Sequence, residues 1–200
     1  GDEYIDEALS DEEAEQGMVL TCQMVPSSDC VVEIPAAASL CSKAGNESVT
    51  GTVGEVNLIS PTAIELKITA DTDIGFLPGQ YVNIQVPGTE ETRAYSFSSR
   101  PSSRELSFLI RNVPGGLMSS WLVGKAKTGD KVTLTGPMGV FYLRPVQRPV
   151  LMLAGGTGLA PFLAMLESLK EKGCEQPTHM IYGVTNDDDL VGLAALEAFA

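Results

Sequence analysis

Between residues 49 and 134, hydrophobic and polar positions alternate in short runs that glycine, proline, aspartate and serine turns separate. Alternation with a period of two is typical of strands with one buried face. One helical stretch, residues 117–122, follows the fifth run. Six strands with one helix after the fifth predict a closed antiparallel barrel. The predicted strands are residues 49–58, 62–70, 80–86, 93–97, 105–111 and 131–134.

After residue 148 the pattern changes to strand, helix, strand, helix, which predicts the opening of a parallel α/β domain. Residues 149–166 are uncharged, but glycines and Pro161 interrupt them, so we expect a buried strand and a helix start instead of a membrane span. Such a domain needs more strands to bury both faces, and we expect it to be truncated here. The four segments are 150–153, 162–172, 179–184 and 192–199.

The first 36 residues form a separate region. Ser10 and Glu13 predict a capping box at the start of a short helix that Gly17 ends. Two strands are predicted beyond it, at 18–26 and 30–35, with a turn between them. The small and polar residues 37–47 predict a linker. The chain does not begin with methionine, and residues 2–9 are expected to be cut from something longer.

Composition narrows the class of protein. A chain of 200 residues, 44% hydrophobic and 20% charged, predicts one or two folded domains. The net charge of -13 argues against nucleic acid or an anionic membrane as partner, because phosphates attract clustered lysine and arginine. Residues 1–42 hold ten acids and no lysine or arginine, which indicates a solvated surface or one that steers a basic partner.

The four cysteines form no Cys-x-x-Cys pair and no secretory signal precedes them, which favours the cytoplasm. His179 is the one histidine of the chain and is expected to be structural.

Residues 93–97 carry a cation, a large ring and a small hydroxyl on one strand. Arg93, Tyr95 and Phe97 share one face, and Ala94 and Ser96 share the other. These groups suit a ligand with a phosphate, a flat heterocycle and a hydrogen-bonding edge, such as a flavin nucleotide. The alternative is an ordinary strand with buried rings and a solvated arginine.

Two glycine turns are candidate anion sites. Gly116 precedes the helix at 117–122, and the open N–H groups and positive dipole end of that helix suit a pyrophosphate. Residues 155–161 differ from Gly-x-Gly-x-x-Gly because Pro161 stands where the third glycine would be. Proline in a first helical turn still leaves N–H groups for a dinucleotide. The alternative for residues 155–161 is a tight strand-to-helix turn.

An Arg-x-Tyr-Ser strand, a Gly-x-Met-Ser helix start and this glycine turn, in that order, resemble the ferredoxin–NADP reductase family of flavoproteins. Residues 77–82 also resemble that family's Pro-Gly-Gln turn. The resemblance implies an FAD-binding barrel at 48–147 and the first part of a Rossmann-like NAD domain at 148–200. FMN is the alternative flavin. Gly136 and Gly139 would close the barrel and either let backbone approach the flavin or the next domain, or form a simple turn.

The resemblance also implies roles for single residues. Arg93 would pair with the flavin phosphate, Tyr95 would pack on the ring or ribityl chain, and Ser96 would hydrogen-bond near the flavin nitrogen that accepts a hydride. The implied catalytic residues are Ser96, Tyr95 and Thr157. The implied cofactor-binding residues are Arg93, Tyr95, Ser96, Phe108, Ile110, Arg111, Gly116, Leu117, Met118, Ser119, Gly155, Gly156, Thr157, Gly158, Pro161, Tyr182 and Gly183.

The nicotinamide nucleotide would lie where Tyr182 and Gly183 end the second parallel strand. The acidic residues 187–189 follow with no arginine, which disfavours a 2′-phosphate and favours NADH over NADPH. The alternative for these acids is a helix cap or a solvated turn.

A short acidic helix, then Leu-Thr-Cys-Gln, then a strand resembles the last third of a plant-type, β-grasp [2Fe-2S] ferredoxin domain. The resemblance implies that Cys22 is the fourth cluster ligand and that residues 1–36 are a ferredoxin remnant. The other three ligands are not in these 200 residues, so the chain alone would carry no iron. Without the resemblance, Cys22 would be a small buried hydrophobe. Cys30, Cys41 and Cys174 are expected to be structural.

This order of domains resembles the reductase components of bacterial ring-hydroxylating dioxygenases, of the benzoate and anthranilate type. The resemblance implies electron transfer from NADH through FAD and the [2Fe-2S] cluster to a terminal oxygenase. One alternative is the reductase of a methane or phenol monooxygenase. An alternative from another class is a non-catalytic binding module that kept the barrel.

Overall fold

The computed structural model describes residues 10–19, 25, 27–29, 31, 48–101 and 104–199. The chain divides into two compact units, Gly1–Cys41 and Ser42–Ala200. In the first unit, helix α1 (Asp11–Glu15) has the predicted capping box, in which the Glu13 N–H donates to Ser10 Oγ and the Ser10 N–H donates to Glu13 Oε2. The strands predicted at 18–26 and 30–35 fall mostly outside the described residues, and Cys22 and the linker 37–47 fall entirely outside them.

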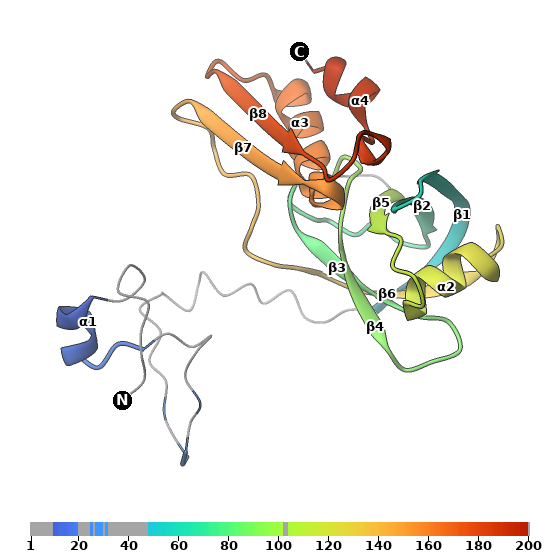
Figure 1. The fold of residues 1–200 in the computed structure, drawn as a ribbon, viewed down its shortest axis with the longest axis horizontal. Helices are drawn as coiled ribbons and strands as arrows, with labels where there is room; N and C mark the ends of the chain where they lie inside the picture. The colour runs from blue at the N-terminus through green and yellow to red at the C-terminus, as the bar shows by residue number, and fades with distance from the viewer. Residues whose placement is uncertain are drawn as a thin grey trace. The chain divides into compact units, whose positions relative to one another are not determined.

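The second unit begins with the predicted antiparallel barrel (Figure 1). In space its strands follow the order β4-β3-β6-β1-β2-β5. A bridge between Phe97 and Phe108 joins the two ends of this order and closes the barrel. The strands are β1 (Ser48–Ser60), β2 (Ala63–Ala70), β3 (Tyr81–Gln85), β4 (Thr92–Ser96), β5 (Glu105–Arg111) and β6 (Lys131–Met138), and helix α2 (Leu117–Gly124) follows β5.

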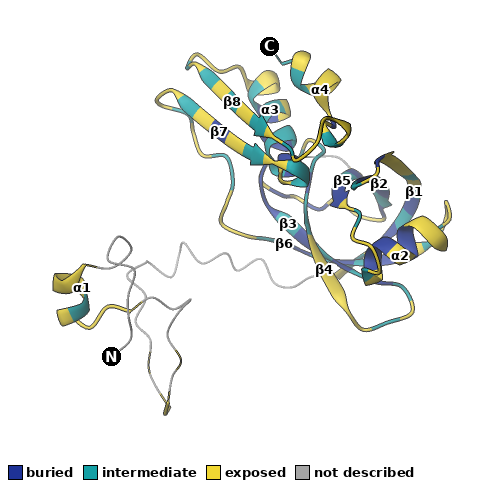
Figure 2. Cartoon of the chain, in the orientation of Figure 1, coloured by how far each residue is buried: buried dark blue, intermediate teal, exposed yellow. Residues whose placement is uncertain are grey.

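The barrel interior is filled by side chains from alternate strand positions, and Figure 2 shows these buried positions along the strands. The Phe97 ring stacks on Phe76 with centroids 3.8 Å apart and lies 5.4 Å from the Phe108 ring. Arg93, Tyr95 and Phe97 were predicted to share one face of the strand. Along that face burial increases toward the core: Arg93 is exposed, Tyr95 is half-buried and Phe97 is fully buried.

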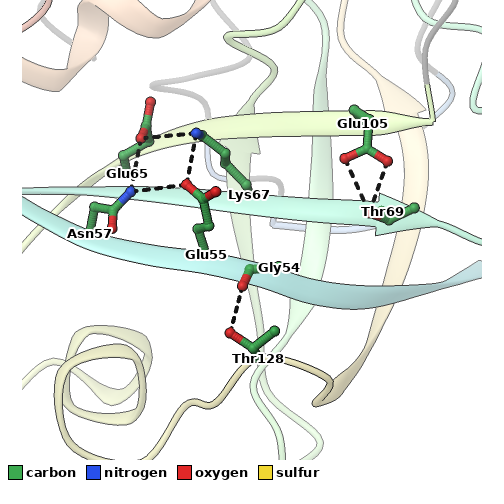
Figure 3. A network of polar contacts seen from close by, with 8 residues as sticks. All are labelled: Gly54, Glu55, Asn57, Glu65, Lys67, Thr69, Glu105 and Thr128. Atoms are coloured by element: carbon green, nitrogen blue, oxygen red, sulfur yellow. Dashed lines mark hydrogen bonds and ion pairs between the residues drawn. The ribbon is translucent and has the colours of Figure 1, made fainter.

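Part of the outer barrel surface is a polar network on β1, β2 and β5 (Figure 3). Lys67 Nζ donates to Glu55 Oε2 at 2.8 Å and lies 3.9 Å from Glu65. The hydrogen bond between Lys67 and Glu55 lowers the pKa of Glu55 and raises that of Lys67. Thr69 Oγ1 donates to Glu105. Exposed ion pairs stabilise a fold only weakly, so this face is solvated surface and not a second core.

The α/β part has two parallel strands, and its predicted order is confirmed. Its elements are β7 (Val150–Gly155), the single turn η2 (Gly156–Leu159), α3 (Ala160–Lys172), β8 (Thr178–Gly183), the single turn η3 (Asp187–Asp189) and α4 (Leu193–Glu197). None of the helices in the described ranges is long and apolar enough to cross a membrane.

The prediction that β7 is a buried strand is wrong for one of its faces. On one face Met152 is buried and Ala154 packs against the apolar cluster that contains Leu159 and Ala160. On the other face, Leu151 and Leu153 remain 60% and 62% exposed, because nothing in the described part of the chain packs over them.

The barrel and the α/β part meet at the Pro-Gly-Gln turn. The Leu143 N–H donates to Pro78 O at 2.8 Å. Gly79 has φ +108°, and a Cβ there would lie 2.5 Å from Met165 Cε and 2.6 Å from Phe141 O. The turn thus has glycine where α3 and the connection between the domains approach its backbone.

Gly136 and Gly139 lie at the end of β6, and their closest approaches are to residues of the barrel. Gly139 has φ +97°, and a Cβ there would lie 2.9 Å from the Tyr81 ring. The close approach at Gly139 is therefore to a barrel tyrosine and not to the next domain.

Candidate functional site

A cleft of about 490 Å³ opens where β4, β5 and the first turns of α2 and α3 meet. Ala94, Leu109, Val113 and Ala160 complete its lining. The predicted site residues that line it are Arg93, Tyr95, Ser96, Arg111, Gly116, Leu117, Met118, Ser119, Thr157, Gly158 and Pro161. Residues from both halves of the second unit therefore face one cleft, of a size that small-molecule sites commonly have.

A second cleft, of about 350 Å³, lies beside the first at the carboxyl ends of β7 and β8. Arg111 and Thr157 line both clefts, so the two adjoin at these side chains. The other predicted residues in the second cleft are Gly155, Gly156 and Gly183, and the rest of its lining is Thr62, Ala63, Val184, Thr185, Asp189 and Val191.

Arg93 lies exposed at the mouth of the first cleft. Its Nη1 donates to Glu91 Oε2 at 3.1 Å and to Thr92 O at 2.7 Å. Because an exposed ion pair is worth little, a phosphate can replace Glu91 as the partner of this guanidinium at small cost.

Tyr95 lies between the barrel core and the first cleft, packed against the core. Burial raises the pKa of Tyr95 to about 12, although the nearby Arg93 charge acts in the opposite direction. Its phenol is therefore neutral at neutral pH and offers a flat ring and a hydrogen-bond donor to a ligand. Ser96, half-buried beside it, adds a hydroxyl.

Helix α2 begins with free backbone donors at the cleft. Its N-cap is Gly116, which makes no side-chain cap hydrogen bond. The first N–H groups of a helix have no partner within it, and the helix dipole places partial positive charge there. Met118, 2% exposed, anchors the first turn in the barrel core. The arrangement suits an anion, as predicted.

Ser119, predicted to bind cofactor, lines the first cleft, but its hydroxyl already has two partners. Its Oγ donates to Arg111 O at 3.2 Å and accepts from the Val113 N–H at 2.9 Å. A hydroxyl has one proton, so it cannot also donate to a pyrophosphate in this arrangement. Ser119 holds the turn between β5 and α2, and the backbone of that turn remains to meet a ligand.

Phe108 and Ile110, predicted to bind cofactor, line neither cleft. They are 0% and 1% exposed and belong to the barrel core. The physical reason is alternation along β5, which turns Leu109 and Arg111 toward the clefts and their neighbours inward. Tyr182 lines neither cleft either; it packs against the apolar cluster around Leu159, and burial raises its pKa.

The glycine turn after β7 leaves its backbone open. Gly155, Gly156 and Gly158 have no atom within 4 Å of the position that a Cβ would take. Packing therefore does not explain these glycines. The left-handed φ of +51° favours glycine at position 156, and the open space over Gly155 and Gly158 leaves room for a ligand close to the backbone. Pro161 lies in the first turn of α3, as predicted.

Thr62 and Asp189 are the residues of the second cleft whose roles sequence reasoning missed. Thr62 belongs to the β1–β2 turn, 127 residues before Asp189, and its Oγ1 donates to Asp189 Oδ1. The other oxygen of Asp189 accepts from Asn186 Nδ2 at 3.3 Å. One of the three acids predicted to repel a 2′-phosphate is therefore engaged in a contact between domains. No local pattern signals such a pair.

Known families match both parts of the second unit. Residues 52–142 match the oxidoreductase FAD-binding domain family. Residues 152–200 match the oxidoreductase NAD-binding domain family. The first cleft is formed mainly by the first match and the second cleft mainly by the other, with Arg111 and Thr157 between them.

Relatives match over the whole chain. The toluate 1,2-dioxygenase electron transfer component of Pseudomonas putida is 57% identical over 100% of this chain. The 2-halobenzoate 1,2-dioxygenase electron transfer component of Burkholderia cepacia is 45% identical over 100% of it. Methane monooxygenase component C of Methylosinus trichosporium is 33% identical over 97%. The chain spans about 60% of the length of these relatives.

The fold also has a close counterpart among solved structures. The crystal structure of the Amycolatopsis cytochrome P450 reductase GcoB superposes with a TM-score of 0.74 at 29% sequence identity, covering 98% of this chain and 60% of that one. Fold, paired clefts, family matches and relatives agree with one another. The chain therefore belongs to the ferredoxin–NADP reductase-like family of FAD- and NAD-binding oxidoreductases.

Proposed function

We propose that this chain is part of an NADH-dependent flavoprotein reductase that passes electrons through FAD and a [2Fe-2S] cluster to a terminal aromatic-ring dioxygenase. The observation that carries the proposal is the junction of the two clefts at Thr157 and Arg111. A flavin in the first cleft and a nicotinamide in the second would meet there. Catalysis by such a protein is chiefly alignment of two bound rings.

The flavin is assigned to the first cleft. Arg93 would pair with a phosphate, the open N–H groups at the start of α2 would receive the pyrophosphate, and Tyr95 and Ser96 would contact the ring system. Two anion sites in one cleft favour FAD over FMN. Bound FAD would supply the conversion between two-electron and one-electron transfer, which side chains cannot perform.

The nicotinamide nucleotide is assigned to the second cleft, over the open backbone of Gly155 and Gly156. Thr157 would reach toward both rings. Asp187 and Asp188 remain exposed near this end of the sheet, which favours NADH over a nucleotide with a 2′-phosphate. These are the roles that we propose for the predicted catalytic and NAD-binding residues.

The iron-sulfur step rests on Cys22 as the fourth cluster ligand, with the other three supplied from outside these 200 residues. The electron acceptor is proposed to be the oxygenase of a benzoate-type dioxygenase. The two relatives with the highest identities among those above act with toluate and halobenzoate dioxygenases, and the methane monooxygenase component is more distant. We also propose a cytoplasmic location, where thiols stay reduced.

A non-catalytic binding module is disfavoured by the retained site. Such a module would have no need for Arg93, Tyr95 and Ser96 in one cleft, or for a glycine turn with open space above it.

The decisive experiment is a visible absorption spectrum of the intact protein, before and after anaerobic addition of NADH. We expect flavin bands that NADH bleaches and broad iron-sulfur absorption beneath them. A colourless protein that takes up no added flavin would refute the proposal and leave the binding module.

Two substitutions test flavin binding and electron transfer to the oxygenase separately. Arg93→Ala should lower flavin retention on dialysis, whereas Arg104→Ala, on the same barrel but in neither cleft, should not.

Cys22→Ser should leave reduction of a dye by NADH intact and abolish transfer to the oxygenase. Normal oxygenase turnover in that variant would exclude Cys22 as a ligand.

A further inference from the structure

Residues 48–147 and 148–199 share a side-chain hydrogen bond, and a ring contact in which Phe141 and Phe162 lie edge to face with centroids 5.8 Å apart. Within the ranges that the structure describes, the bond from Thr62 Oγ1 to Asp189 Oδ1 is the only side-chain hydrogen bond between residues 48–147 and 148–199. Both residues line the second cleft. A hydroxyl that donates to a carboxylate makes one of the stronger hydrogen bonds of a folded protein.

Both ends of this contact are held in place. On the α/β side, Asn186 Nδ2 donates to the second oxygen of Asp189 at 3.3 Å. On the barrel side, the Thr62 N–H donates to Ser60 Oγ at 3.2 Å. The Thr62 carbonyl accepts from the Asn112 N–H at 2.7 Å, and Asn112 Nδ2 donates to the neighbouring carbonyl of Pro61 at 3.1 Å.

These bonds connect the two clefts. Asn112 follows Arg111, whose side chain lines both clefts and whose carbonyl accepts from Ser119 Oγ. A continuous path of hydrogen bonds and backbone therefore runs from Asp189 through Thr62 to the turn that precedes α2. Movement of the α/β part relative to the barrel would disturb this path at the Thr62 contact first.

The contact beside this hydrogen bond is apolar and restricts the angle between the two parts less sharply. Ala63 and Leu109 from the barrel pack with Leu159, Ala160 and Val191. The free energy gained by burying apolar surface depends mainly on the area buried and not on direction. A hydrogen bond weakens steeply when its angle departs from linear, so it can fix an orientation.

We propose that Asp189 and Thr62 are positioning residues that fix the orientation of the nicotinamide domain on the flavin barrel, and with it the alignment of the two clefts. The inference rests on the proposed function and deepens it. Neither residue is assigned a contact with reacting atoms. Small misalignments of bound reactants are known to cost large factors in rate.

The test compares three threonine variants of the intact protein. Thr62→Val keeps the shape of the side chain and removes the donor, and Thr62→Ser restores the donor. Thr69→Val is the matched control, because Thr69 lies on the adjoining strand β2, also donates to a carboxylate, and lines neither cleft (Figure 3).

Binding of NAD⁺ to the oxidised protein, measured by equilibrium dialysis, is the readout that needs no turnover. We expect Thr62→Val to weaken NAD⁺ binding about tenfold, which corresponds to roughly 1.4 kcal/mol. Flavin content should stay unchanged, and reduction of the flavin by NADH should slow. Thr62→Ser should restore both quantities most of the way, and Thr69→Val should change neither.

A double substitution at Thr62 and Asp189 is an independent test of whether the two side chains act together. If the two side chains act through their mutual contact, Thr62→Val combined with Asp189→Ala should bind NAD⁺ no more weakly than Asp189→Ala alone. Additive losses, a Thr62→Ser variant as weak as Thr62→Val, or wild-type NAD⁺ affinity in Thr62→Val would each overturn the inference. If wild-type flavin is not reduced by NADH at all, the proposed function fails instead, which keeps the two failures distinct.

Discussion

Tyr95 shows how the environment of one residue sets its chemistry. Burial raises its pKa from 10.0 to about 12, so the fold favours the neutral phenol. The stability that follows from this preference is fully present below pH 10 and is lost as pH rises toward about 12, because only the unfolded chain releases the proton in that interval.

We therefore expect the wild-type protein to lose stability between pH 10 and about 12 faster than Tyr95→Phe, which has no proton to release. Chemical denaturation across that interval measures the difference, and tyrosinate absorbance follows the ionisation itself. Identical pH dependence in the two proteins would mean that Tyr95 titrates as freely when folded as when unfolded.

At the scale of a residue, the sequence predicts which side chains gather in a cleft more readily than it predicts their roles. A cation, a ring and a hydroxyl on one strand identified Arg93, Tyr95 and Ser96, which the structure brings together in one cleft. Phe108 and Ile110 lie in the barrel core and outside both clefts, because a strand has two faces and the motif does not say which one points inward.

At the scale of an element, the turn between β5 and α2 depends on Ser119. Its hydroxyl satisfies the Val113 N–H and the Arg111 carbonyl from a position that is 5% exposed. The next serine on the same helix, Ser120, is exposed. The two serines form a matched pair in which only one supports the turn.

We expect Ser119→Ala to lower the free energy of unfolding by about 1–3 kcal/mol, because it leaves polar backbone groups of the turn without their partner. Ser120→Ala should stay within about 0.5 kcal/mol of wild type. Urea denaturation measures both. Flavin affinity should fall in Ser119→Ala and not in Ser120→Ala. Equal losses of stability and of flavin affinity in the two variants would contradict the role that we give to Ser119 in the turn.

The elements themselves were largely predictable because their signals are local. Alternation located all six barrel strands, although β6 continues to Met138, beyond the predicted end at residue 134. The role of Ser119 was not predictable, because a Gly-x-Met-Ser motif indicates an anion site without saying whether side chain or backbone meets the anion.

At the scale of the whole molecule, the fit of the α/β part on the barrel depends on Gly79. A Cβ at this position would collide with Met165 Cε, Phe141 O and Tyr142 Cα. Gly88 has a similar positive φ of +80°, but no atom lies within 4 Å of its Cβ position. Alanine at Gly88 therefore reports the cost of the backbone conformation alone.

We expect Gly88→Ala to cost about 1–2 kcal/mol, the penalty for a side chain in the left-handed region. Gly79→Ala should cost roughly 1–3 kcal/mol more, because the added methyl group overfills the contact with α3. Thermal unfolding of the two variants gives the comparison. Equal losses would show that α3 adapts to the methyl group without strain.

How the domains fit together was not predictable from the sequence. The contact between Thr62 and Asp189 joins residues 127 positions apart, and the acidic run that contains Asp189 does not indicate a partner in the barrel. Patterns with periods of two or four residues describe elements, whereas the orientation of one domain on another depends on single contacts between distant turns.

The way in which the barrel closes has a further consequence. Strands β4 and β5 are joined by the bridge between Phe97 and Phe108, and beyond it Arg93–Ser96 and Leu109–Arg111 separate around the first cleft. Along this opening the facing backbone edges have no neighbouring strand among the described residues. A ligand bound there would take the place of a seventh strand, so flavin uptake should slow amide hydrogen exchange along both edges at once.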